Sequence, residues 1–364
     1  MIATKISFEN YRNIEKADIA LSEGLNVLYG DNAQGKTNAL EGIYLFAQGR
    51  SFRTHKEREY IGPAQDSAYL ALTFTGAAGP QQAEMRFFKN GKKSVRKNGV
   101  PERKMSEFLG AFRAVMFCPE HLNIVKAGPA ERRRFLNESL SQLSSGYISA
   151  LQRYNGILAQ RNRLLSRFYE DQKTVRQTIG LWNEQLAAEA AVISARRAEY
   201  VERLAGHVKG FFDEMTSGAE APGLLYHGEK DKAAFVRQLE ESFETDCRLG
   251  TTSRGVHKDD IVMTINGKDA RAFASQGQQR SFALALKLSE AEISRGKTQE
   301  YPVMLLDDIL SELDEKRKNF VLSGIRDRQV IMTTCDGKAA GLTDKDGRKM
   351  IKVENGSYQT CIYT

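Results

Sequence analysis

The hydrophobic positions near the N-terminus alternate with polar ones, which is the period of a β-strand. Ile6 and Phe8 fall on one side of such a strand, with charged or hydroxyl residues between them. A second alternation at residues 17–21 and an apolar run at residues 25–29 predict two further strands. From residue 37 to residue 47 the apolar spacing changes to three and four, which predicts a helix directly after the third strand.

The segment from residue 130 to residue 213 carries a long stripe of apolar residues at helical spacing. Polar residues near 170–177 interrupt the stripe, so the sequence predicts two amphipathic helices joined by a short turn. Each arm has about forty residues and reaches on the order of 60 Å at 1.5 Å per residue. Such a hairpin is far shorter than the coiled-coil arms of chromosome-organising ATPases.

Strands and helices alternate again after this helical segment. Strands are predicted at 261–265, 303–306 and 329–332, and helices at 278–294 and 314–325. Because such units flank the helical segment on both sides, we predict an α/β sheet built from both ends of the chain. The predicted head is split, residues 1–125 plus 245–364, and a mainly helical lobe is inserted at residues 126–244.

The composition excludes several classes of protein. Of the 364 residues, 41% are hydrophobic and 27% are charged, which is typical of a folded soluble chain. No apolar run approaches the roughly 18 residues that cross a bilayer, and the N-terminus lacks the apolar stretch of a signal peptide. The four cysteines are scattered, which argues against a zinc site or a disulfide framework and predicts a cytoplasmic protein.

The octapeptide GDNAQGKT has the pattern G-x-x-x-x-G-K-S/T of a phosphate-binding loop, and it lies between a predicted strand and a predicted helix. Its glycines allow a tight turn whose N–H groups face phosphate oxygens, its lysine adds a positive charge, and its threonine offers a hydroxyl to Mg²⁺. We therefore predict that the chain binds ATP and Mg²⁺. The nucleotide-binding residues of this loop are Gly30, Asp31, Asn32, Ala33, Gln34, Gly35, Lys36 and Thr37.

The sequence VMLLDD, residues 303–308, is an apolar run that ends in two carboxylates. Such a strand places its acids at the carboxyl edge of the sheet, beside the phosphate loop. We predict that Asp307 and Thr37 hold Mg²⁺, and that Asp308 is the catalytic residue that orients or polarises the attacking water. Because the loop and these acids are far apart in sequence, the helical lobe has to be inserted within the nucleotide-binding domain.

The sequence SQGQQR, residues 275–280, opens the next predicted helix, and its serine and glycine make a second anion-binding terminus. Just ahead of the carboxylate strand, it resembles the signature motif of the ATP-binding-cassette superfamily, and residues 311–314 resemble that superfamily's D-loop. A small-molecule kinase would leave this motif unexplained. A transporter ATPase subunit fits neither the signature sequence nor the basic helical lobe.

Taken in order, the motifs resemble the RecF family of bacterial recombinational-repair ATPases over nearly the whole chain. The segments that carry the resemblance are the phosphate loop, FENYRN (8–13), GRSFRT (49–54), MFCPEHL (116–122), GPAERRRFLN (128–137), HKDD (257–260), FASQGQQR (273–280) and LLDDILSELD (305–314). The resemblance implies that Arg12 and Asn13 lie near the nucleotide. It also implies that Ser275, Gly277 and Gln278 contact the γ-phosphate bound by another subunit, in a head-to-tail, ATP-dependent dimer.

Two departures from the family pattern bear on the γ-phosphate. Val256 and Lys258 stand where proline and arginine are expected in a GPHRDD-like stretch. Transporter-type cassettes carry a switch histidine after the last core strand, whereas this chain has the sequence TTC there. Whether His257 or Thr334 senses the γ-phosphate stays open, and we expect slow hydrolysis.

Basic residues cluster in a predicted β-meander at residues 68–101 and along the helical lobe, in a chain with net charge +7 and a pI of about 9.1. A charge cluster is usually only a solvated face, but with the family resemblance it predicts a surface that contacts the DNA backbone by shape and charge. The predicted DNA contacts are Lys92, Lys93, Arg96, Arg132, Arg133 and Arg134, extended by Lys97, Arg103, Lys104, Arg161, Arg163 and Arg167.

The sequence thus predicts an ATP-dependent DNA-binding protein of recombinational repair and replication-gap processing, with a weak, DNA-stimulated ATPase activity. ATP would close a homodimer around DNA, and hydrolysis would release it. The resemblance implies double-stranded DNA and gapped junctions as DNA partners, and RecO and RecR as protein partners in loading recombinase. The alternative is a nucleotide-gated DNA-binding module whose hydrolysis is incidental.

Overall fold

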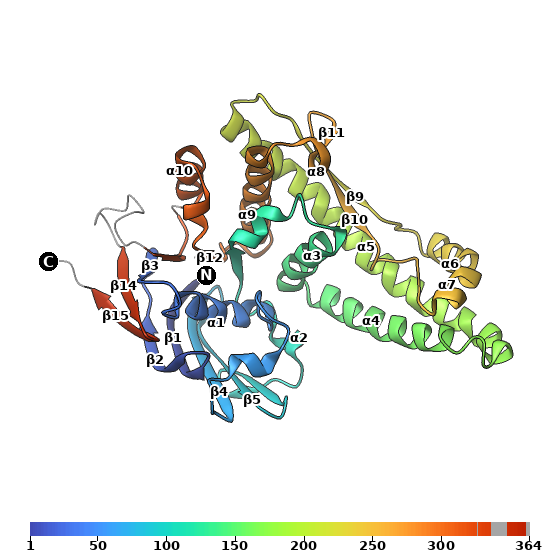
Figure 1. Cartoon of the computed structure of the whole chain (residues 1–364), viewed down its shortest axis with the longest axis horizontal. Coiled ribbons are helices and arrows are strands. Elements are labelled where there is room, and N and C mark those ends of the chain that lie inside the picture. The colour runs from blue at the N-terminus through green and yellow to red at the C-terminus, as the bar shows by residue number, and fades with distance from the viewer. Residues whose placement is uncertain (326, 336–347, 362–364) are drawn as a thin grey trace. The chain divides into compact units, whose positions relative to one another are not determined.

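The computed structural model describes residues 1–325, 327–335 and 348–361 of the chain (Figure 1). The chain divides into two compact units. We call residues 1–123 together with 283–364 the head unit, and residues 124–282 the arm unit. Within the described residues, no helix combines the length and the apolar character needed to span a bilayer.

The head unit contains a six-stranded sheet assembled from both ends of the sequence, as predicted. Its order is β15-β14-β3-β13-β12-β8, and all neighbours from β14 to β8 are parallel. Strand β12 is buried at every position, which explains why its sequence is apolar from Val303 up to the terminal Asp307. The strands are β3 (Leu25–Tyr29), β8 (Ala114–Phe117), β12 (Val303–Asp307), β13 (Val330–Thr334), β14 (Lys349–Glu354) and β15 (Ser357–Cys361).

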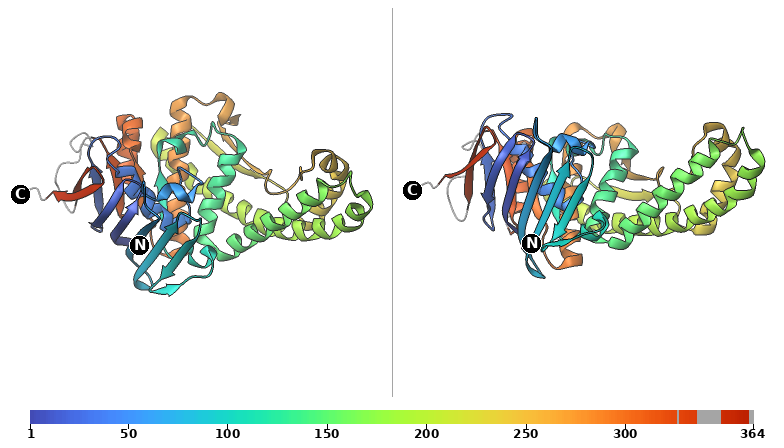
Figure 2. Two further views of the ribbon diagram at one scale, coloured as in Figure 1. Left: turned by 60° about the horizontal axis from the view of Figure 1, so that its bottom comes forward. Right: turned by 90° about the horizontal axis from the view of Figure 1, so that it is seen from below.

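A second sheet of the head unit is antiparallel throughout, with the order β2-β1-β4-β5-β6-β7; its strands are blue to cyan in Figure 2. The predicted meander is confirmed, and Asn98 and Gly99 have the positive φ angles, 51° and 79°, of a tight hairpin turn. The strands are β1 (Ile2–Tyr11), β2 (Ile14–Ala20), β4 (Ser67–Gly76), β5 (Gly79–Phe88), β6 (Lys93–Lys97) and β7 (Val100–Pro101).

The helix predicted after the third strand is α1 (Lys36–Gln48), and it lies between the two sheets. It contacts β12 and β13 on one side and β4 on the other, so it is buried around most of its circumference. The remaining short elements are α2 (Met105–Phe108), α10 (Glu315–Gly324), η1 (Glu57–Tyr60), η2 (Pro119–Asn123) and η3 (Ile309–Glu312).

The arm unit is built on the predicted helical hairpin, formed by α4 (Ser145–Leu165) and α5 (Gln172–Thr216), which run side by side in Figures 1 and 2. The prediction of one continuous first arm is wrong, because α3 (Pro129–Leu143) ends just before Ser144. Ser144 has an extended backbone, and its hydroxyl accepts the N–H of Tyr147 at 3.2 Å. This side-chain cap begins a new helix inside the apolar stripe.

A three-stranded sheet, order β11-β10-β9, completes the arm unit, and β9 packs on α5. Since β10 pairs with β9 over its full length, residues after the predicted lobe fold with it. The predicted lobe, 126–244, lies within the arm unit, which also takes in residues 245–282. The elements are β9 (Pro222–His227), α6 (Lys232–Glu241), α7 (Phe243–Leu249), β10 (Asp260–Ile265), β11 (Lys268–Asp269), α8 (Ala270–Phe273) and α9 (Gln276–Thr298), which continues into the head unit.

Candidate nucleotide-binding site

The phosphate loop follows β3, and its two glycines occupy positions that a side chain would disrupt. Gly30 has a φ of 148°, and a Cβ there would lie 2.3 Å from the carbonyl oxygen of Val353. Gly35 has a φ of 113° and caps the N-terminus of α1. The Tyr358 hydroxyl on β15 donates to the Gly35 carbonyl at 2.9 Å and braces the loop. The loop therefore has the form of a tight, anion-binding turn at a helix start.

Lys36 is buried, and its ammonium group is held by the backbone of the loop itself. Its Nζ donates to the carbonyl oxygens of Gly30 at 2.5 Å and Asp31 at 2.7 Å. These bonds fix a positive charge where the loop turns into α1. A positive charge held at the loop would stabilise an anion bound by the N–H groups of the loop.

Thr37 and Asp307 lie in direct contact, although they are far apart in sequence. The Thr37 hydroxyl donates to Asp307 Oδ1 at 2.8 Å, and the Thr333 hydroxyl on β13 donates to the same oxygen at 2.8 Å. Burial raises the pKa of Asp307, although these two hydrogen bonds and the charge of Arg53 oppose the shift. A hydroxyl and a carboxylate are the hard oxygen ligands that Mg²⁺ prefers, so this pair fits the predicted metal.

Asp308 follows directly and is held in a left-handed backbone conformation with a φ of 46°. Its backbone N–H donates to the Thr333 hydroxyl at 2.9 Å, and its carbonyl accepts the Ser311 hydroxyl at 2.7 Å. The hydrogen bonds on both sides of the residue maintain this uncommon conformation. Thr333 thus contacts both acids, a role that sequence reasoning missed because it considered this residue only as part of the TTC sequence after the last predicted strand.

Glu41 is a second residue that sequence reasoning missed. It is fully buried in α1, and the Arg12 guanidinium donates to its two oxygens at 2.9 and 2.6 Å. The hydroxyls of Tyr11 and Ser51 also donate to this carboxylate. The contacts tie the FENYRN and GRSFRT segments to the helix that follows the phosphate loop. The only sign of this role in the sequence was that Glu41 is a single acidic residue among the apolar residues of the predicted helix.

Asn13 lies beside the loop, as the resemblance implies. Its Oδ1 accepts from Asn38 Nδ2 at 2.7 Å, and it lies 3.1 Å from where a Cβ on Gly35 would stand. Arg12 instead points its guanidinium at Glu41 and over the ring of Tyr60, 5.6 Å from the ring centre. The direct nucleotide contacts of Arg12 and Asn13 stay predictions.

The three predicted signature residues belong to the arm unit. Ser275 and Gln278 form a reciprocal cap at the start of α9: the Ser275 N–H donates to Gln278 Oε1 at 2.8 Å, and the Gln278 N–H donates to Ser275 Oγ at 3.2 Å. Gly277 lies between them in the first turn of α9. Their contact with a nucleotide on a second subunit stays a prediction.

His257 is engaged on both ring nitrogens within the arm unit. The Tyr154 hydroxyl lies 2.6 Å from Nδ1, and the Thr252 carbonyl lies 2.9 Å from Nε2. Burial lowers the pKa of this histidine. Thr334 ends β13, the strand that also carries Thr333.

The predicted DNA-contacting residues separate into exposed and buried sets. Lys92, Lys93 and Arg96 are exposed on or beside β6, and Lys93 pairs with Glu57. Arg132, in contrast, is 5% exposed. Its Nε and Nη2 donate to the two carboxylate oxygens of Asp260 at 2.6 and 2.7 Å. Its assignment to a DNA-contacting surface is therefore corrected, because this pair would have to break first.

The other arginines near Arg132 are also engaged. Arg133 donates to the Asp259 carbonyl at 2.8 Å, and Arg134 pairs with Glu138 at 2.9 Å. Arg161 is fully buried, so its assignment to the DNA-contacting surface is corrected as well. Arg163 and Arg167 on the same stretch are exposed.

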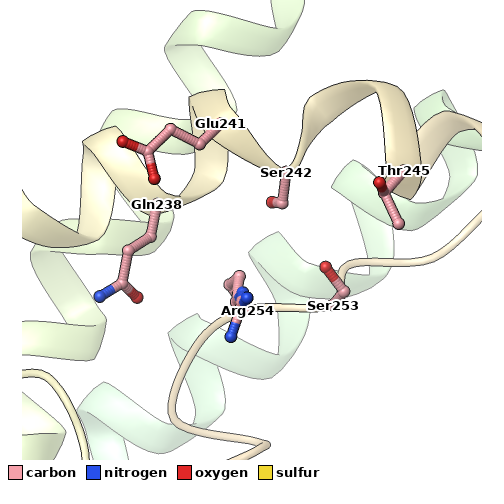
Figure 3. A pocket seen from close by; sticks show the side chains of 6 residues that line it. All are labelled: Gln238, Glu241, Ser242, Thr245, Ser253 and Arg254. Atoms are coloured by element: carbon pink, nitrogen blue, oxygen red, sulfur yellow. The ribbon is translucent and has the colours of Figure 1, made fainter.

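The arm unit also contains a polar cavity of about 370 Å³. Figure 3 shows its lining side chains, which come from α6, from the start of α7 and from the loop that precedes β10. They are Gln238, Glu241, Ser242, Thr245, Ser253 and Arg254. None of the predicted nucleotide-binding residues lines it.

This geometry defines the class of protein: an α/β P-loop ATPase head of the ATP-binding-cassette type that carries a helical arm. The Smc head domain from Pyrococcus furiosus has the same fold, with a TM-score of 0.57 and 15% identity over 99% of this chain and 96% of that one. A family model described as "RecF/RecN/SMC N terminal domain" matches residues 2–357.

Individual relatives narrow the family. The DNA replication and repair protein RecF of Lachnospira eligens is 37% identical over 358 residues, 98% of either chain. That of Alkaliphilus oremlandii is 38% identical over 344 residues, 92% of this chain and 93% of its own. A solved structure of the recombination mediator protein RecF with ATP has a TM-score of 0.92 and 33% identity, over 99% of this chain and 98% of that one. The chain belongs to the RecF family.

Proposed function

We propose that this protein is an ATP-dependent DNA-binding protein of DNA replication and recombinational repair, in the cytoplasm. The observation that carries the proposal is the contact of Thr37 with Asp307, which joins the phosphate loop to the carboxylate strand. Support comes from the relatives, which are named as DNA replication and repair proteins, and from a RecF structure determined with ATP. That RecF is described as a recombination mediator in the RecFOR pathway, and RecO and RecR are the partners we propose here.

Each residue of the site has a proposed task. The loop N–H groups and Lys36 bind the phosphates of ATP, while Thr37 and Asp307 hold Mg²⁺, which supplies charge neutralisation when bound. Asp308 accepts a hydrogen bond from the attacking water and aligns it. Thr333 keeps both acids in place through its single hydroxyl. We expect slow, DNA-stimulated hydrolysis.

The nucleotide site is completed by a second copy of the chain. Ser275 at the start of α9 presents a hydroxyl and a helix N-terminus, which are suited to bind an anion. In a head-to-tail homodimer this terminus contacts the γ-phosphate held by the partner's loop, and ATP therefore stabilises the dimer around DNA. Double-stranded DNA and gapped junctions are the proposed ligands.

Sedimentation of the purified protein with and without Mg·ATP and duplex DNA tests the proposal. We expect a shift from monomer to dimer with Mg·ATP, strengthened by DNA. Monomers that persist with saturating Mg·ATP and DNA would refute it. Release of DNA at equal rates with ATP and with a non-hydrolysable analogue would instead identify a nucleotide-gated binding module whose hydrolysis is incidental.

A further inference from the structure

The side-chain amide of Gln278 is used on both of its ends inside the arm unit. Its Oε1 accepts the backbone N–H of Ser275 at 2.8 Å, and its Nε2 donates to Glu220 Oε1 at 2.9 Å. The amide oxygen therefore caps the turn, and one of the two amide N–H groups is held by the carboxylate, so both ends of this side chain are fixed in orientation. The Ser275 hydroxyl only accepts in this arrangement, from the Gln278 N–H, so its own proton can still be donated.

Glu220 lies in the connection between α5 and β9, and this connection is itself held in place. The N–H and the carbonyl of the next residue, Ala221, bond to the side chain and the backbone of Asn266, each at 2.8 Å. Asn266 belongs to the turn between β10 and β11, with a φ of 52°. Glu220 is half-buried at this point, so its carboxylate is presented from a fixed backbone.

The start of α9 is also held from its other side. Gln279 Nε2 donates to the carbonyl of Ala274 at 3.1 Å, and the Ala274 N–H donates to the carbonyl of Ala270 at 3.2 Å. Gln279 therefore ties the start of α9 to the connection from α8, and Gln278 ties it to Ser275 and Glu220. Of these two anchors, only the one through Gln278 reaches the α5–β9 connection.

We propose that Glu220 is a positioning residue: through Gln278 it sets the orientation of Ser275 and thereby couples the arm to ATP-dependent self-association. Gln278 then acts as the link between Glu220 and Ser275. This inference rests on the proposed function, because it presumes that the start of α9 meets the nucleotide bound by a second copy of the chain. A well-oriented donor contributes more to binding than a mobile one, because less conformational entropy is lost.

The test compares Glu220→Ala and Glu220→Gln with wild type and with Glu214→Ala, a matched loss of an exposed glutamate near the end of α5. We expect Glu220→Ala to weaken Mg·ATP-dependent dimerisation, measured by sedimentation equilibrium, by about tenfold, the size of one hydrogen bond to a charged group. Binding of a fluorescent ATP analogue by the monomer should not change, because the phosphate loop lies in the head unit. Glu214→Ala should match wild type.

The conservative variant separates positioning from a general structural effect. In Glu220→Gln the side-chain carbonyl can still accept from Gln278, so we expect most of the dimerisation to return. Gln278→Glu places two carboxylates next to each other and should weaken dimerisation. The double variant Gln278→Glu/Glu220→Gln exchanges the two residues, so the amide at position 220 can donate to the carboxylate at position 278 and dimerisation should recover. This double variant keeps the test valid if Glu220→Ala loses its fold.

Two results would overturn the inference: wild-type dimerisation by folded Glu220→Ala, or a double variant no better than Gln278→Glu alone. Either result leaves the proposed dimer intact. If wild type itself does not dimerise with Mg·ATP, the proposed function fails first, and the inference fails with it.

Discussion

At the scale of individual residues, one buried carboxylate, Glu41, holds together the segments that surround the helix after the phosphate loop. An isolated charge inside a head built of apolar strands would be costly, and here Arg12 neutralises it through two hydrogen bonds. The Ser51 hydroxyl adds a further donor. The contacts of Glu41 with Arg12 and Ser51 therefore fix the segments before and after α1 against the helix that carries Lys36 and Thr37.

Lys36→Ala tests the charge of the loop. Removing the ammonium group takes away a charge-assisted interaction with the phosphates, worth about 1.5–3 kcal/mol. We expect ATP binding, measured by isothermal titration, to weaken at least about tenfold. The head should stay folded, since the lost hydrogen bonds go to backbone carbonyls at the edge of the loop. Unchanged affinity would show that this loop does not bind the nucleotide.

Asp308→Asn tests the proposed alignment of water. The amide keeps the size of the side chain but loses the charge that polarises water, so we expect hydrolysis to fall by at least about a hundredfold. ATP binding should persist, and the dimer with Mg·ATP should last longer than that of wild type. Phosphate release and sedimentation measure the two effects. A wild-type rate of phosphate release would remove Asp308 from the catalytic role.

The residues that could be predicted individually belong to motifs that require particular residue types at particular positions within a short stretch of sequence. The loop from Gly30 to Thr37 and the pair Asp307–Asp308 carry their pattern within a few neighbouring positions. Glu41 and Thr333 act through partners distant in sequence, and no local pattern marks them. The same reason explains the error at Arg132, whose carboxylate partner, Asp260, comes from a strand far along the chain.

At the scale of elements, a buried ion pair holds the arm together. Arg161 on α4 and Asp246 on α7 are both fully buried and lie 2.8 Å apart. We expect Arg161→Met to lower the free energy of unfolding by about 3–5 kcal/mol, because the buried carboxyl group of Asp246 loses its cationic partner. Chemical denaturation followed by circular dichroism measures the change.

The control for that experiment is the exposed pair of Arg153 on α4 with Glu189 on α5, at 2.6 Å. Arg153→Met should cost less than about 1 kcal/mol, because solvent screens the pair. If both variants lose the same free energy of unfolding, then burial of the ion pair does not determine how much it contributes to stability.

The elements that could be predicted were those with an uninterrupted period. Helix α1 and strand β12 match their predicted positions within a residue or two, because each is buried along most of its length and its apolar pattern is therefore not interrupted. The break at Ser144 could not be predicted from the apolar stripe, since the stripe continues through it. Strand β9 has mixed exposure and only six residues, so its sequence shows no clear alternation.

At the scale of the whole molecule, the sheet built from both ends of the chain could be predicted, because Lys36 and Asp307 have to meet for the chemistry to work. Strand β3 comes from the N-terminal part and β12, β13 and β14 from the C-terminal part. The extent of the arm could not be predicted in the same way. Residues 245–282 join it through the pairing of β9 with β10, a long-range contact that local sequence does not encode.

The DNA-binding prediction also belongs to the whole molecule, because backbone contacts add up over a surface. Lys92 and Arg96 are exposed on the meander. On duplex DNA, each neutralised phosphate makes the slope of log affinity against log salt concentration steeper by roughly 0.9. If Lys92 and Arg96 each neutralise one phosphate, the double variant Lys92→Ala/Arg96→Ala should have a slope that is shallower by about 1.8. Fluorescence anisotropy with labelled duplex at several salt concentrations in Mg·ATP measures this slope.

Arg153→Ala, which removes an exposed but paired arginine of the arm, should leave the slope unchanged. A slope equal to that of wild type in the double variant would move the DNA-contacting surface away from β6.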